Sequence, residues 1–213
     1  MLKQIFLSFT VLLLFFFAGC SKPPAPTAQT NEKINPLRYP VQKKLDKEKL
    51  VKINLKKGYV EIRCIYSYDV NALIASKEHY NSWDWAGELA PYDFALVWGD
   101  LAIKDNYEFV KFWQGGRWYH FKLRKNAPFG LDFVYKNSSN NHLIPKNENI
   151  KRALKIAKRW QPVRIKGYLV SISGKINNRN VWWQSSFSRD DRGSGSCEVI
   201  FVTSIQIGNN IYE

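Results

Sequence analysis

Two segments of the sequence hold the residue types that nucleophilic catalysis requires. The stretch SSNNHLIP contains His142, and residues 185–198 (SSFSRDDRGSGSCE) contain serines, Asp190, Asp191 and Cys197. A hydrolase needs a serine or cysteine nucleophile, a histidine base within hydrogen-bond reach and a group that orients the base. These residues would supply all three. The spacing G-x-S-x-G of a nucleophile elbow is absent, however, and a tight loop plus a flexible hairpin loop would give the same pattern.

The same side chains would also offer ligands to a metal ion. Asp190, Asp191 and Glu198 provide carboxylates and His142 an imidazole. Calcium loops place their acids at alternating positions, whereas here two acids are adjacent and an arginine flanks the pair on each side. The local pattern therefore favours an ion-pair cluster, and we expect neither a metal site nor a cofactor.

The N-terminus has the parts of an export signal in order. Lys3 is followed by an apolar run over 5–17, which is too short for the roughly 20 residues of a membrane-spanning helix. The run ends in Phe17-Ala18-Gly19-Cys20, which resembles the lipobox of bacterial lipoproteins, with phenylalanine where leucine is usual. The resemblance implies that Cys20 receives a diacylglycerol and, after cleavage, further acylation such as palmitate. Ser21 after it is typical of lipoproteins sent to the outer membrane, facing the periplasm, in bacteria with two membranes.

Three parts of the chain follow from this reading. Residues 1–19 are the signal peptide, 20–47 the lipidated cysteine with a proline-rich linker and a basic segment, and 48–213 a single globular domain. With Cys20 lipidated, Cys64 and Cys197 are the only pair left for a disulfide in an oxidising compartment. Two separate buried thiols would suit the same positions.

The domain reads as α+β with a mainly antiparallel sheet, or a small, partly open OB-like barrel, with one basic amphipathic helix. Period-two alternation and glycine turns predict the following hairpins and strands: 50–66, 109–123, 163–171, 181–187 and 197–205. The helix is expected over 147–160, with apolar residues on one side and five cations on the other: Lys151, Arg152, Lys155, Lys158 and Arg159. No long repeat or nucleotide-binding fingerprint is present.

The composition limits the partners. Hydrophobic residues make up 45% of the chain and aromatic residues 15%, which excludes global disorder. A net charge of +14 favours anionic partners, although a lysine-rich background would give the same value. Near a lipid anchor, the helix cations would add to membrane attraction or simply form a solvated face. Trp113, Trp118, Trp182 and Trp183 alternate with basic residues and would either stack on sugars or bases or fill the core.

Together with PYDFALVWGDL (residues 91–101), the two polar segments resemble an uncharacterised family of exported or membrane-anchored bacterial proteins, over residues 60–204. The resemblance implies one domain and export, and it brings no established activity. We therefore expect a lipid-anchored envelope protein that binds an anionic envelope polymer, lipid head groups or a protein partner, rather than nucleic acid. The alternative is a hydrolase that uses His142 and the 185–198 loop.

Overall fold

The structure is a computed structural model, and it describes residues 22–188 and 197–213. The predicted signal peptide and Cys20 lie outside the described residues. The elements in chain order are β1 (Ala28–Gln29), β2 (Val41–Leu55), β3 (Gly58–His79), α1 (Trp85–Leu89), β4 (Tyr92–Val97), the 3-10 helix η1 (Gly99–Ala102), α2 (Lys104–Tyr107), β5 (Val110–Gly115), β6 (Trp118–Leu123), α3 (Leu131–Lys136), β7 (Ser138–Pro145), α4 (Glu148–Ile156), β8 (Pro162–Ile176), β9 (Arg179–Gln184), β10 (Glu198–Ile207) and β11 (Asn210–Tyr212).

Five strands form a partly closed ring of pairings. β3 pairs with β4 and β8, β4 pairs with β7, and β10 joins β7 to β8. Every pairing in the ring is antiparallel except that between β7 and β10. The predicted α+β class with a mainly antiparallel sheet is therefore confirmed. Helix α4 lies between the third and fourth ring strands in the chain, and it is one of four α-helices within residues 22–188 and 197–213, where a single helix was predicted.

Strand β3 is long enough to pair with two different strands along one edge. Its first part pairs with β2 and its last part with β4, while β8 runs along the opposite edge. The register shifts between Cys64 and Tyr66 against β8 and between Ile74 and Ser76 against β4. Such irregularities bend a strand and increase its twist, so they help the sheet to curl into the ring.

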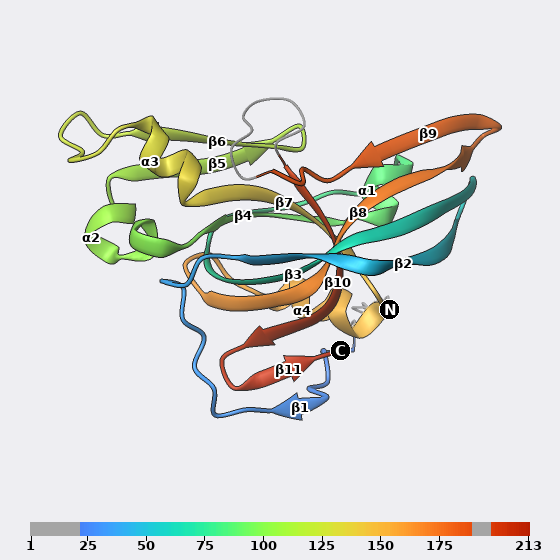
Figure 1. Cartoon of the computed structure of the whole chain (residues 1–213), viewed down its shortest axis with the longest axis horizontal. Helices are drawn as coiled ribbons and strands as arrows, with labels where there is room; N and C mark the ends of the chain where they lie inside the picture. Colours follow the sequence, from blue (N-terminus) through green and yellow to red (C-terminus); the bar gives the residue numbers. More distant parts are fainter. Residues whose placement is uncertain (1–21, 189–196) are drawn as a thin grey trace, which may run out of the picture.

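Three groups of buried side chains fill the domain. Inside the ring, Phe94 and Leu143 pack against Leu154 of α4. A second group lies between β2, β3, β8 and β9 and includes Cys64. The third lies under the β5–β6 hairpin, where Phe112 contributes its ring. Figure 1 shows this hairpin and α3 at one end of the molecule, with the β2–β3 and β8–β9 tips at the other.

Helix α4 is shorter than predicted. Asn147 caps its start by accepting a hydrogen bond from the Ile150 amide, but the helix ends at Ile156 instead of residue 160. Ala157 has ψ 137°, which is extended rather than helical. The ammonium of Lys77, from β3, donates to three carbonyl oxygens just there, at 2.9, 2.7 and 2.9 Å. A half-buried cation at a helix C-terminus satisfies carbonyls that have no partner within the helix, and Lys77 does so at the point where α4 ends.

The N-terminal part of the described chain packs on the domain. β2 begins at Val41, so the boundary predicted near residue 48 falls inside a strand. β1 pairs with the C-terminal strand β11, and Ala25 exchanges hydrogen bonds with the Asn149 side chain. Parts of the segment predicted as linker and basic segment over 20–47 thus pair with the domain, namely Ala25, β1 and the start of β2. Within the described residues, none of the helices is both long and apolar enough to span a membrane.

Candidate ligand-binding surface on the β5–β6 hairpin

The β5–β6 hairpin has one buried face and one exposed face. Gly116 and Arg117 form the turn with φ of 59° and 70°, the left-handed values that two-residue hairpin turns need. Phe112 points into the core. On the exposed face the Trp113 and His120 rings stack at 5.5 Å between centroids. The hairpin is therefore held by one face and free to contact a ligand with the other.

Arg117 connects the hairpin turn to the outer side of the ring through hydrogen bonds. Its guanidinium donates to Asp93 Oδ1 at 3.0 Å and to the Ala90 carbonyl at 2.8 Å. It also lies over the Tyr80 ring, 3.9 Å from the centroid, and the Arg117 amide donates to the Tyr80 hydroxyl at 2.9 Å. Burial, with a contribution from the Asp93 charge, raises the pKa of Tyr80 to about 12. Tyr80 therefore stays protonated at neutral pH.

Asp93 is the centre of this cluster. Its carboxylate is fully buried and meets Arg117 on one side and His142 Nδ1, at 2.9 Å, on the other. The His142 ring is itself covered by Trp183 of β9, with 4.8 Å between centroids. A buried charge is tolerated only with such partners, so the cluster holds β4, β6, β7 and β9 together.

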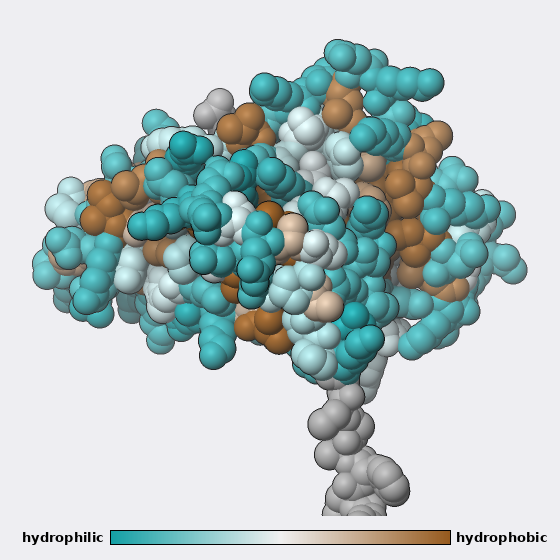
Figure 2. All heavy atoms as spheres, turned by 90° about the horizontal axis from the view of Figure 1, so that it is seen from below, coloured by the Kyte–Doolittle hydropathy of each residue, from teal (hydrophilic) through white to brown (hydrophobic). Residues whose placement is uncertain are grey.

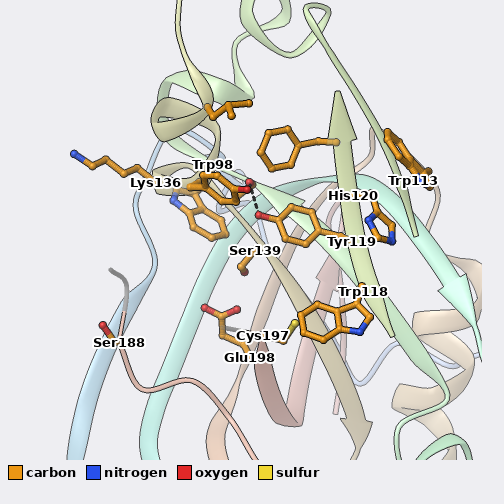
Figure 3. A pocket seen from close by; sticks show the side chains of 14 residues that line it. Trp98, Trp113, Trp118, Tyr119, His120, Lys136, Ser139, Ser188, Cys197 and Glu198 are labelled. Carbon is orange, nitrogen blue, oxygen red and sulfur yellow. Dashed lines mark hydrogen bonds between the residues drawn. The ribbon is translucent and has the colours of Figure 1, made fainter. Parts of the chain in front are cut away.

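A cavity of about 380 Å³ lies at the turn end of the hairpin (Figure 3). Trp98 and Tyr119 face it, Glu198 and Cys197 lie below them, and Trp118 stands beside Cys197. The Tyr119 hydroxyl is 3.3 Å from Ser138 Oγ, and burial raises the pKa of Tyr119. The cavity is thus an aromatic pocket whose wall holds one carboxylate, Glu198, and one ammonium, Lys136, without an excess of positive charge.

A second, more open cavity of about 970 Å³ lies at the other end of the same hairpin. Its floor includes Trp160, which stacks on Tyr107 at 4.3 Å. Five cations line this basic groove: Lys111, Lys122, Arg124, Lys125 and Arg159. The one acid in its wall, Glu108, lies 3.7 Å from the Lys104 ammonium. The basic groove therefore concentrates positive charge around an aromatic platform.

Of the predicted catalytic residues, the structure describes only His142 and Cys197, which lie on or beside the paired strands β7 and β10. His142 contacts Asp93 and Trp183, and among the described residues it makes no hydrogen bond to a serine or cysteine. Cys197 instead lies at the pocket, where its sulfur is 3.8 Å from Asn140 Nδ2. Asp190 and Asp191 lie outside the described residues. The geometry gives the hydrolase alternative no support.

Of the two alternatives for Cys64 and Cys197, a disulfide or two separate thiols, the structure has thiols that are not bonded to each other. Cys64 is buried on β3 in the second core group, whereas Cys197 precedes β10 and lines the pocket. Strand β8 separates β3 from β10 in the ring, so the two side chains belong to different neighbourhoods. Burial raises the pKa of the Cys64 thiol to about 11.

The predicted basic surface is divided by the end of α4. Lys151, Arg152 and Lys155 lie on the helix, and Lys151 pairs with Glu148 at 3.2 Å. Lys158 and Arg159 follow it, and Arg159 joins the basic groove. In the part of the chain that the structure describes, no group of three or more His, Cys, Asp or Glu residues could hold a metal ion.

The sequence reading missed the residues that organise this surface. Asp93 was read only within the motif PYDFALVWGDL, and Arg117 only as the start of a strand. One local signal was available: an aspartate within a six-residue apolar strand must find a buried partner. The partner lies 24 residues away in the chain, so its identity required the fold. Comparisons of the chain with family models, curated proteins and solved structures gave no match.

Proposed function

We propose that this protein is a lipid-anchored envelope protein whose domain binds an anionic envelope component through the basic groove. The observation that carries the proposal is the set of five cations around the Trp160 platform, with a single acid that already faces a lysine. Cations on a concave surface focus the field and raise the local concentration of anions. A ligand with several acid groups would contact several of these side chains at once.

The neighbourhood of the groove supports charge recognition rather than a structural role for these cations. Lys111 and Lys122 occupy directly opposed positions on β5 and β6. Like charges in opposed positions destabilise a strand pair, so this arrangement costs stability unless an anion offsets it. The five-cation groove also fits the net charge of +14.

The anchor is the part of the proposal that rests on the sequence. The lipobox-like Phe17-Ala18-Gly19-Cys20 would attach the chain to a membrane on its exported side, and Ser21 fits the outer membrane if two membranes are present. Two or more acyl chains are needed for stable anchoring. Expression with a labelled fatty acid tests this: the chain should carry the label, and Cys20→Ser should abolish labelling. Labelling of Cys20→Ser equal to that of the natural chain would contradict the anchor.

The binding proposal is tested with polyphosphate as the probe. The change Lys111→Glu with Lys122→Glu should abolish binding at low salt, because it reverses two of the five groove charges. The matched control, Lys56→Glu with Lys57→Glu, makes the same change of net charge at the β2–β3 turn. Equal binding losses in both variants would show that total charge acts instead of the groove. Unchanged binding in the groove variant would refute the site.

A further inference from the structure

The exposed face of the β5–β6 hairpin carries more than charge. Three pairs of opposed positions follow one another along it: Lys111 with Lys122, Trp113 with His120, and Gly115 with Trp118. The first pair belongs to the basic groove. The next two form what we call the aromatic row, namely Trp113, His120 and Trp118. Charge and rings thus lie on one continuous face.

Packing does not account for the aromatic row. Trp113 and Trp118 keep 43% and 41% of their surface exposed. The hairpin already buries its opposite face, including Phe112, against the core. Single exposed hydrophobic residues are ordinary, but here the exposed rings are aligned in register beside a cation pair. An aligned row of this kind indicates a ligand of repeating structure.

We infer that the ligand of this surface is an anionic polysaccharide, whose acid groups contact the basic groove and whose sugar rings stack on the aromatic row. This inference rests on the proposed function. Successive positions on one face of a strand lie about 6.8 Å apart, so the face presents its side chains at a regular spacing to a chain of repeating units. A polymer that combines rings with acid groups therefore matches the face, whereas polyphosphate offers charge alone.

The two ends of the hairpin set the direction of such a ligand. The basic groove lies at the Lys111 end, and the aromatic pocket is lined by all three residues of the aromatic row. The pocket wall holds Glu198 together with Lys136, whereas the groove wall holds five cations. The acidic part of the polymer therefore occupies the groove, and uncharged ring faces lie towards the pocket.

The experiment compares three polyanions on the full chain in non-ionic detergent: dextran sulfate, polyphosphate and single-stranded DNA. The natural chain should prefer dextran sulfate at equal charge concentration. The variant Trp113→Leu with Trp118→Leu should weaken dextran sulfate binding by roughly fivefold or more per tryptophan, on the scale of ring stacking, and leave polyphosphate binding unchanged. Trp83→Leu is the matched control, because Trp83 is 89% exposed and lies at a different cavity.

Each result separates this inference from the proposed function. If the tryptophan variant binds both dextran sulfate and polyphosphate as the natural chain does, or loses affinity for both equally, the polysaccharide inference is overturned while the groove proposal stands. If no polyanion binds the natural chain, both fail. If DNA binds more tightly than dextran sulfate with the same tryptophan dependence, the ligand class is nucleic acid and the inference is overturned. A far-ultraviolet circular dichroism spectrum and a midpoint of urea unfolding close to those of the natural chain show that the variant is folded.

Discussion

Replacing Arg117 by methionine should destabilise the domain strongly, because it leaves the Asp93 carboxylate without its cation. Asp93 is fully buried, and removing one partner of a buried pair costs about 3–5 kcal/mol. The Arg117 side chain is 21% exposed and His142 remains beside Asp93, so we expect the lower end of that range, about 3 kcal/mol. For a chain of this size the midpoint of thermal unfolding should fall by roughly 6–12 °C.

A double-mutant cycle with Asp93→Asn isolates the pair itself. Urea unfolding of Arg117→Met, Asp93→Asn and the double variant should give a coupling free energy above about 1.5 kcal/mol, because the second change costs little once the first has been made. The control is Arg63→Met, which breaks an exposed ion pair with Glu48 (3.4 Å) and should cost no more than about 1 kcal/mol.

Two outcomes would refute this reasoning. Additive free energies in the cycle would show that Arg117 and Asp93 stabilise the fold independently. A loss for Arg117→Met no larger than that for Arg63→Met would show that the hairpin does not depend on the buried pair. Hydrogen exchange adds a local test, because the amides of β5 and β6 should lose protection before those of β8 if Arg117 fastens the hairpin.

Lys77→Met should cost about 1–3 kcal/mol of unfolding free energy, because three carbonyl oxygens at the end of α4 lose their donor. The control, Lys155→Met on the exposed side of the helix, should change the unfolding free energy by less than about 0.5 kcal/mol. Equal urea midpoints for the two variants would contradict the capping role. Without reductant, a thiol reagent should modify Cys197 in the folded protein and Cys64 only after unfolding, and a mass that shows a disulfide would contradict the two separate thiols. The Cys64 thiol loses its proton near pH 9 when unfolded and near pH 11 when folded, so the unfolded state binds fewer protons in this window and stability falls as pH rises. Relative to Cys64→Ala, the natural chain should therefore lose up to about 2.7 kcal/mol between pH 9 and pH 11, and a flat difference would refute the burial effect.

Local patterns sufficed for the hairpin and for one end of helix α4. The glycine turn and the flanking strand-like residues predicted the hairpin, but whether Trp113 and Trp118 face the core or the solvent stayed open until the fold placed them. The start of α4 was predictable from Asn147, a good N-cap residue. The end of α4 was not, because Lys77 lies on a strand far away in the sequence.

The surface also combines a property that the sequence predicts with one that only the fold decides. Figure 2 shows a largely hydrophilic surface with separate hydrophobic patches, as the charge and composition lead one to expect. The fold decided which cations lie together. Arg159 was predicted on the helix with Lys151, but the helix ends before Arg159. The Arg159 guanidinium instead lies beside β5, 3.4 Å from the Phe112 carbonyl oxygen.

By itself, the sequence determined the α+β class, the hairpin and the excess of positive charge, because these depend on composition and on short-range periodicity. Only the tertiary structure decided that Asp93, Arg117 and His142 meet, that Cys64 and Cys197 stay apart, and that the N-terminal segment packs on the domain. Those outcomes depend on which strands pair across the ring, and strand pairing joins residues whose spacing along the chain carries no signal of contact.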